Sequence, residues 1–408
     1  MADRFEAFRY SSYTRYFISR FFTSFSAQVL SVAVGWQIYD ATRDPALLGW
    51  IGLVQFLPAL TLVVVTGNAA DRLGRRLVMG CAMLLMMACA GTILYLATTD
   101  QFGPVLVLSV LTLFGVARAF YGPASTSLAV NLVPREVFPN AVGWISSSWQ
   151  LASIAGPVAG GLLYGLSPTA AYGTATTLFA VGAILILTIP KPPQLVDRTP
   201  TTLTSLLGGF SYIWKEKIVL GAITLDLFAV LLGGAVALLP VYARDILDVG
   251  EMGLGLLRAA PGVGAIIALA IITAFPIRDY AGWILLVSVA LFGLSTAVFG
   301  ASTLAWVSIL ALMCVGAFDM VSVYVREILV QLWTPDQVRG RVNAVNSIFV
   351  GASNELGEAR AGFMAAFIGP VVTVVAGGFA AVGIAGLSAF LFPKLRDARK
   401  LHEGRPER

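Results

Sequence analysis

Charged side chains are scarce in this sequence. Only 12% of its 408 residues are Asp, Glu, Lys or Arg, whereas a soluble globular domain carries about 25%. Hydrophobic residues make up 58% of the chain, and its mean hydropathy is +0.83. This composition excludes an ordinary soluble protein and predicts an integral membrane protein.

Cysteine and histidine are nearly absent. Cys81, Cys89 and Cys314 all lie in long apolar stretches, which excludes a disulfide scaffold and a CxxC metal site. The single histidine, His402, lies in the C-terminal tail. We therefore expect no metal and no cofactor, and carboxylates remain the only groups in the apolar stretches that could carry a proton.

Long apolar runs recur along the whole chain. A helix needs roughly 20 apolar residues to cross a bilayer, and twelve runs approach or exceed that length. They cover residues 16–39, 47–68, 77–97, 103–131, 140–165, 170–190, 218–241, 252–275, 282–300, 304–332, 342–366 and 371–392. The sequence therefore predicts an all-α integral membrane protein with twelve transmembrane helices.

The basic residues between these runs indicate the orientation. If the N-terminus is cytoplasmic, only Arg43 and Arg244 among the loop arginines and lysines fall outside. Cytoplasmic loops gather Lys and Arg, so we expect both termini in the cytoplasm and the chain in the cytoplasmic (inner) membrane. The net charge of +5 is then a topology signal, and no nucleic-acid binding is expected. Residues 1–15 are polar and do not fit a cleavable signal peptide.

An internal repeat divides the chain into two halves. Residues recur at offsets of 203 or 201 positions, as in the pairs Tyr39 and Tyr242, Gly52 and Gly255, Pro58 and Pro261, Gly115 and Gly316, and Pro134 and Pro335. Because each half has an even number of spans, the halves share one orientation. We predict an N-terminal six-helix bundle at 1–190, a cytoplasmic linker at 191–217 and a C-terminal six-helix bundle at 218–408.

Two motifs give these halves a family resemblance. Residues 67–76 read GNAADRLGRR, and this loop is similar to the signature that the major facilitator superfamily carries between its second and third spans. Residues 152–161 read ASIAGPVAGG and resemble the fifth-helix signature of the drug-proton antiporter branch. The stretches GWQIYDATRDPALLG, LLPVYARDIL, GLGLLRAAPGVGA and SNELGEARAG resemble the enterobactin-exporter group. The resemblance covers the full chain and implies the major facilitator fold, two pseudo-symmetric six-helix bundles.

The fifth-helix motif is rich in residues that a soluble helix tolerates poorly. Ala152, Gly156 and Gly160 are spaced by four and form one face of small residues, and Pro157 bends the helix. In lipid, small residues let helices pack closely, so helix packing with a kink explains the spacing by itself. The resemblance adds a second role for the motif, which also includes Gly161: a seam between the halves that closes the cytoplasmic side during export.

The loop motif concentrates charge at the end of the second span. Its residues are Gly67, Asp71, Arg72, Gly74, Arg75 and Arg76. Positive-inside charge is one explanation. The other is a cytoplasmic gate in which Asp71 caps a helix end or pairs with an arginine in one state and releases it in another. The equivalent loop of the second half keeps only Arg278 and Asp279, so the first loop is the main gate candidate.

Ionisable residues inside the predicted spans are the strongest functional signal, because each costs at least about 2.5 kcal/mol to insert. They are Arg20, Arg118, Arg258, Arg326, Arg360, Asp226, Asp319, Glu327, Glu355 and Glu358. The set is formally neutral, which favours pairing. Snorkelling at a span end is the alternative for Arg20, Arg258 and Arg360.

Helical spacing sorts the polar residues into faces that could line water. Asp319, Ser322 and Arg326 share one face, and the repeat places Arg118 at the depth of Asp319, where the two could meet across a central cavity. The cavity and substrate candidates are Gln28, Arg118, Asp319, Ser322, Arg326 and Asn354.

Four carboxylates are candidates for proton coupling. Glu355 and Glu358 lie one turn apart, and two carboxylates so close in a low dielectric do not both ionise easily. We place this pair first and Asp226 and Asp319 behind it. Arg326 or Arg118 would keep Asp319 charged. Asp226 is alone in its predicted span, so burial could also favour its protonated form, and its place below the glutamates stays open.

These observations predict a secondary transporter that exports an organic molecule in exchange for protons by alternating access. The resemblance alone implies a siderophore-like or amphipathic drug-like substrate. An uptake porter or uniporter for a small metabolite is the alternative, and a membrane sensor that moves no substrate is a remote one. No nucleophile–base constellation or cofactor loop appears, so no enzyme activity is predicted. The expected partners are the small-molecule substrate, protons and membrane lipid, and we expect a monomer.

Overall fold

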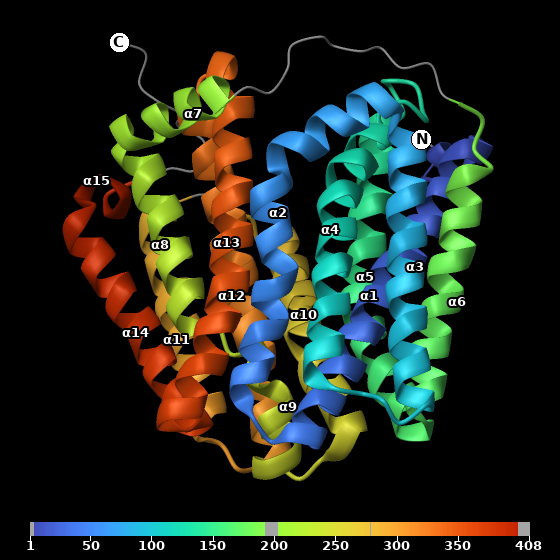
Figure 1. Cartoon of the computed structure of the whole chain (residues 1–408). Coiled ribbons are helices and arrows are strands. Elements are labelled where there is room, and N and C mark those ends of the chain that lie inside the picture. The colour runs from blue at the N-terminus through green and yellow to red at the C-terminus, as the bar shows by residue number, and fades with distance from the viewer. Residues whose placement is uncertain (1–3, 192–202, 278, 399–408) are drawn as a thin grey trace. The chain divides into compact units, whose positions relative to one another are not determined.

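The computed structural model describes residues 4–191, 203–277 and 279–398. Within these ranges it describes all side chains except those of residues 63–64, 67–68, 70–71, 203–207, 209 and 336–337. The regular elements in the described ranges are helices (Figure 1).

The long helices begin and end close to the predicted spans. They are α1 (Ser11–Thr42), α2 (Pro45–Leu73), α3 (Arg75–Thr98), α4 (Pro104–Ala129), α5 (Phe138–Leu166), α6 (Pro168–Leu187), α8 (Lys217–Gly233), α10 (Gly250–Ala274), α11 (Ala281–Ala301), α12 (Ala305–Trp333), α13 (Asp336–Ile368) and α14 (Pro370–Leu391). The shorter elements are η1 (Glu6–Arg9), α7 (Leu203–Lys215), η2 (Val236–Leu238), α9 (Leu239–Val241), the π-helical η3 (Tyr242–Ile246) and α15 (Pro393–Arg396).

Ten helical segments of the described chain are long and apolar enough to cross a membrane. The two other long helices, α5 and α13, are more polar, since α5 carries serines and glycines and α13 carries Glu355, Glu358 and Arg360. The twelve long helices confirm the predicted all-α membrane fold.

The chain folds into two compact units. Unit 1 consists of Met1–Ala41, Leu53–Thr201 and Glu251–Ala259, and unit 2 consists of Thr42–Gly52, Thr202–Gly250 and Ala260–Arg408. Each unit therefore includes one short piece from the other half of the sequence: the first turns of α10 belong to unit 1, and those of α2 belong to unit 2.

Unit 1 is built around α3, which packs against both α4 and α6 (Figure 1). Its core includes Met79 and Met83 of α3, Leu128 of α4 and the fully buried Tyr13 and Tyr16 of α1. Tyr13 donates a hydrogen bond of 2.8 Å to the Ala141 carbonyl. The buried phenols thus keep hydrogen-bond partners, as a membrane interior requires.

In unit 2, α11 packs against α12 and α14, and α8 packs against α12, α13 and α14. The core contains Leu225 of α8, Leu285 and Val289 of α11, and Val325 and Leu329 of α12. This apolar core surrounds the charged residues described below.

The seventh predicted span, 218–241, is interrupted. Helix α8 ends at Gly233, and the chain continues through η2, α9 and η3 to Ile246. Two consecutive glycines, Gly233 and Gly234, are poor helix formers, and the carbonyl of Leu232 beside them accepts a hydrogen bond of 2.6 Å from Arg360 of α13. A side chain thus satisfies a carbonyl at the helix end that would otherwise lack a partner.

The predicted linker is partly helical. Residues 192–202 lie outside the described residues, and 203–215 form α7, which packs on α13 and α8. A second connection, between α2 and α3, consists of Gly74 alone, whose φ of +96° is accessible to glycine and strained for other residues.

Candidate functional site

A buried ion pair joins α8 to α12 in unit 2. Nη1 of Arg326 contacts Oδ2 of Asp226, and the two residues are only 3% and 6% exposed. Their sequence neighbours Leu225 and Val325 belong to the apolar core. Charges buried in this way persist only when they are paired, because desolvation costs several kcal/mol per ion. The pair therefore fixes the facing sides of α8 and α12.

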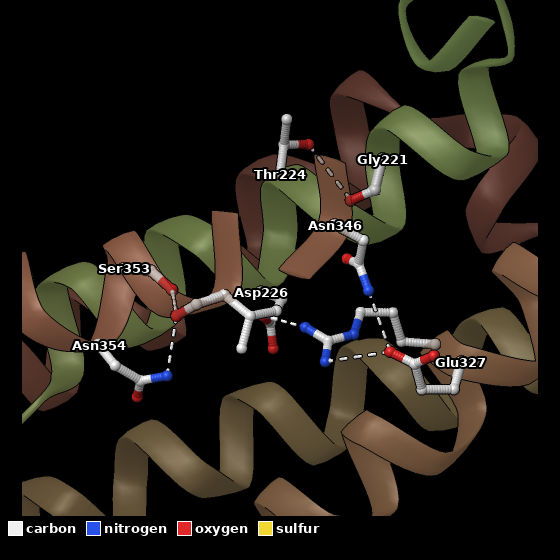
Figure 2. A network of polar contacts seen from close by, with 9 residues as sticks. Gly221, Thr224, Asp226, Glu327, Asn346, Ser353 and Asn354 are labelled. Carbon is white, nitrogen blue, oxygen red and sulfur yellow. Dashed lines mark hydrogen bonds and ion pairs between the residues drawn. The ribbon is translucent and has the colours of Figure 1, made fainter. Parts of the chain in front are cut away.

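A second carboxylate shares the same guanidinium. Nη2 of Arg326 lies 3.7 Å from Oε1 of Glu327, and that oxygen also accepts a hydrogen bond of 3.1 Å from Nδ2 of Asn346 (Figure 2). Glu327 is partly exposed. The network thus extends from the buried pair to α13, and it leads from the core towards a carboxylate that solvent can reach.

Asp319 completes this carboxylate cluster. It lies two helical turns before Arg326 on α12, on the same face, and is within electrostatic reach of both Asp226 and Arg326. No described residue makes a hydrogen bond or salt bridge with its carboxyl group. Asp226 and Glu327 thus contact the Arg326 guanidinium, and Asp319 is a third carboxylate close enough to feel its charge.

The predicted water-lining face of α12 is largely packed. Ser322 and Arg326 are both buried, so these two candidates do not face open space as we expected. The reason is that Arg326 turns to Asp226 of α8, a partner that helical spacing within α12 cannot reveal. Asn354 is exposed, and its Nδ2 donates a hydrogen bond of 2.8 Å to the Val350 carbonyl of its own helix (Figure 2).

Glu355 and Glu358 lie elsewhere in unit 2, where α13 meets the first turns of α2. A Cβ atom at Gly52 would lie 3.5 Å from Oε2 of Glu355 and 3.7 Å from Cβ of Glu358. Both glutamates are half-buried. The structure thus brings this pair against a glycine and leaves it outside the Arg326 network of Figure 2.

Three arginines of unit 1 that lie inside predicted spans donate hydrogen bonds, among their contacts, to hydroxyl and amide oxygens. Nη1 of Arg20 donates to Ser125 Oγ at 2.7 Å and to the Tyr16 hydroxyl at 3.4 Å. Arg118 is exposed and donates to Gln55 Oε1 at 3.3 Å, and Arg258 donates to Ser31 Oγ at 2.7 Å. These hydrogen bonds hold each guanidinium within its helix bundle. Gln28, another cavity candidate, packs with its Cβ against Gly156.

The loop motif attaches the start of α3 to other helix ends of unit 1. Arg75 donates to the Ser127 carbonyl at 2.9 Å, near the end of α4, and Arg76 donates to the Ile189 carbonyl just after α6. Cations are favourable at these carbonyl ends. Arg72 is exposed. The side chain of Asp71 and the details of Gly67 lie outside the described residues.

The fifth-helix motif presents two different faces within unit 1. A Cβ atom at Gly156 would lie 2.6 Å from Cβ of Gln28, and one at Gly160 would lie 3.1 Å from Cα of Val29, so both glycines pack on α1. Ala152, which is fully buried, precedes them by one turn.

The other face of α5 packs on α10. A Cβ at Gly161 would collide with the Glu251 carbonyl, and one at Gly255 would lie 2.6 Å from the Pro157 carbonyl. The small residues of the motif therefore permit two helix crossings: Gly156 and Gly160 meet α1, while Pro157 and Gly161 meet the first turns of α10.

The sequence alone does not predict the pairing of Asp226 with Arg326 or the contribution of Asn346. Asp226 is the only charge in its predicted span, and the neutral set of membrane charges indicates pairing. Neither observation identifies the partner, because the partner depends on how each helix is rotated within its bundle.

Comparison with known proteins agrees with this architecture. The Major Facilitator Superfamily model matches residues 16–317. The enterobactin exporter EntS of Shigella boydii serotype 4 (strain Sb227) is 26% identical over 399 residues, covering 94% of this chain and 92% of that protein. EntS of Escherichia coli (strain K12) shows the same identity and coverage.

Two solved structures illustrate the similarity of the fold. A bacterial homolog of the human lysosomal transporter Spinster, in an inward-facing and occupied conformation, has a TM-score of 0.75 at 13% identity and covers 97% of this chain and 99% of its own. A bacterial homologue of the iron transporter ferroportin, in an inward-facing state, has a TM-score of 0.70 at 15% identity, with coverage of 95% and 98%. Because the family model covers well over half of the sequence, this chain belongs to the Major Facilitator Superfamily of membrane transporters.

Proposed function

We propose that this transporter exports an organic small molecule in exchange for protons by alternating access. The observation that carries the proposal is the cluster of Asp226, Glu327 and Asp319 around Arg326, inside helices long and apolar enough to span the membrane. Ionisable groups at such depth are expensive and usually lie on ion or substrate pathways. The similarity to enterobactin exporters supports export, and a siderophore-like or amphipathic drug-like substrate.

Asp319 is the proton carrier that the contacts favour. The sequence favours Glu355 and Glu358 on the expectation that Arg326 keeps Asp319 charged. In the structure Arg326 contacts Asp226 directly, and Asp319 has no hydrogen bond or salt bridge from a described residue. Asp319 can therefore gain and lose a proton without breaking a bond, whereas protonation of Asp226 would leave Arg326 buried without a counter-charge. Glu355 and Glu358 remain the second candidates.

Two other regions of unit 1 support a moving helix bundle. The contacts of Arg75 and Arg76 with helix ends hold the start of α3 rigidly, which suits the predicted cytoplasmic gate at Asp71. The close crossing of α5 on the first turns of α10 at Gly161 lies at the external end of both helices in the predicted topology. It therefore suits a seam that opens and closes on the external side, and it does not support the cytoplasmic closure that the motif resemblance implies. Both roles are proposals: the gate follows from the motif resemblance and the contacts of Arg75 and Arg76, and the external seam follows from the crossing at Gly161.

Transport direction and proton exchange can be tested together in inverted membrane vesicles, whose cytoplasmic face is outside. We expect vesicles with an acidic interior to accumulate a substrate from a panel of iron-free siderophores and amphipathic cationic drugs, and a protonophore to abolish accumulation. Vesicles without the protein are the control. Accumulation in right-side-out vesicles driven by external acid would instead establish an uptake porter.

A further inference from the structure

Helix α7 is not needed for a twelve-span transporter. It directly precedes the candidate span that begins at Lys217, and it lies across the ends of α8 and α13 in Figure 1. Its place next to the first residue of a span puts it at the level where a membrane meets water.

One face of α7 is attached to unit 2. Ile213 is only 2% exposed and packs with Val219 of α8 and Val330 of α12. The Tyr212 hydroxyl donates a hydrogen bond of 2.5 Å to the Trp333 carbonyl at the end of α12. These contacts fix the rotation of α7, so the directions of its other faces are also fixed.

A neighbouring face, about 100° further around the helix at Trp214, carries large exposed aromatic side chains. Trp214 is 61% exposed and Phe210 is 44% exposed, and their rings stack with centroids 6.2 Å apart. The Phe210 ring also lies 6.3 Å from the ring of Phe349 of α13. Exposed aromatic pairs of this size on a soluble surface mark a contact site. At a membrane boundary, Trp is the residue type enriched at headgroup level, where its apolar ring and its N–H group both find partners.

Basic side chains surround these rings. Lys215 and Lys217 are exposed, and Nζ of Lys217 lies 6.0 Å from the centre of the Trp214 ring. Nη1 of Arg341 lies 3.4 Å from the position of a Cβ at Gly208, so a third cation borders α7. Aromatic rings flanked by lysines at the start of a span match the composition of helices that lie in the membrane interface.

We infer that the face formed by Phe210, Trp214, Lys215 and Lys217, here called the interfacial face, binds anionic phospholipid of the adjoining leaflet. The two rings insert beside the glycerol region, and the ammonium groups contact lipid phosphates. Charge complementarity selects anionic lipid, since basic residues beside a span are attracted to the negative surface of a leaflet. The inference requires only that α8 enters the membrane at Lys217, and it is independent of the transported substrate and of proton coupling.

Brominated lipids test whether Trp214 contacts lipid. The full-length protein and its Trp214→Phe variant are reconstituted into vesicles of phosphatidylcholine or phosphatidylglycerol brominated near the headgroup or near the chain end. The difference in fluorescence between the two proteins is the emission of Trp214. We expect phosphatidylglycerol brominated near the headgroup to quench this emission most. If that emission is unquenched in every vesicle, or is quenched equally by both lipid classes, the inference is wrong.

Lysine variants test the electrostatic part. Binding of fluorescent phosphatidylglycerol to the purified protein is compared for the native chain, Lys215→Gln, Lys217→Gln and the double variant. Each lysine removed should weaken binding roughly fivefold, since one basic residue near an anionic surface contributes about 1 kcal/mol and 1.4 kcal/mol is tenfold. Lys394→Gln removes an exposed lysine in α15 that also follows a span but is not part of this face; it is the matched control and should weaken binding less than Lys215→Gln or Lys217→Gln. Unchanged binding by the double variant, or equal loss in the control, would overturn the inference.

Discussion

Arg326 depends on Asp226 because its guanidinium is almost completely removed from solvent. Two partners share its charge, and only Glu327 reaches an exposed region. We propose different roles for the carboxylates of the cluster: Asp226 stabilises the fold, and Asp319, which has no hydrogen bond or salt bridge from a described residue, carries the proton. The two roles can be separated by measuring stability and transport in the same variants.

We predict that Asp226→Leu destabilises the protein by about 3–5 kcal/mol, because it leaves Arg326 buried without a counter-charge. Thermal unfolding of the purified protein, followed by tryptophan fluorescence, measures the change. Adding Arg326→Met to Asp226→Leu should recover most of the lost stability, since a well-packed apolar pair often replaces a buried ion pair. An unfolding temperature of Asp226→Leu equal to that of the native chain would contradict this role.

The residues of this site are predictable in kind but not in arrangement. The cost of membrane charges identifies Asp226, Asp319, Glu327 and Arg326 as functional candidates, and their formal neutrality within the larger set indicates pairs. Spacing along α12 suggests Asp319 as the partner of Arg326, yet the guanidinium contacts Asp226 of α8. Contacts within a helix follow from its period, whereas contacts between helices depend on their rotation and packing.

Helix α5 also shows that the sequence predicts which residues share a face but not which helix that face contacts. Positions 156 and 160 lie on one face because they are four residues apart, and position 161 lies about 100° further around the helix. The sequence therefore predicts one small-residue face correctly. It does not reveal that this face meets α1 while Gly161 meets α10, because small residues permit a close approach without selecting the partner.

We predict that Gly161→Leu forces α5 and α10 apart, since even its Cβ atom would collide with the Glu251 carbonyl. Overpacking of this kind costs about 1–3 kcal/mol, and substrate export should fall sharply. Gly165→Leu is the matched control on the same helix, because nothing lies within 4 Å of its Cβ position. Thermal unfolding and export assays on both variants check the prediction. Equal behaviour of the two variants would show that the crossing at Gly161 is unimportant.

Helix boundaries are predicted well, and the exception has a local cause. Apolar length and flanking Pro or Gly residues mark the ends of most spans, as at Pro168 and Gly369. The interruption of α8 escapes prediction because the apolar run continues past Gly233 and Gly234. Hydropathy measures affinity for lipid, so it does not detect a break in the helical backbone. This break is stabilised by a hydrogen bond from Arg360 of α13 to the Leu232 carbonyl.

For the complete chain, the motifs predict the family, which the family model confirms. The repeat predicts two halves, and the compact units add a detail that no repeat encodes. The first turns of α2 and α10 each belong to the unit formed mainly by the other half of the sequence. Such exchanges arise from close backbone approaches, as at Gly255 and Pro157, and these depend on three-dimensional packing.

We propose that Asp319, a carboxylate of the unit 2 cluster, couples substrate export to protons. The direct measurement compares two transport modes in proteoliposomes: substrate movement driven by a pH gradient, and downhill substrate exchange without a gradient. The variants are Asp319→Asn, the pair Glu355→Gln and Glu358→Gln, and Asp100→Asn as a control at an exposed turn.

We predict that Asp319→Asn abolishes gradient-driven transport and keeps downhill exchange, because an amide cannot carry the proton but leaves the Asp226 and Arg326 pair intact. The control should retain both modes. Full gradient-driven transport by Asp319→Asn would show that Asp319 is not the proton carrier. If only the double glutamine variant lost gradient-driven transport, proton coupling would belong to Glu355 and Glu358.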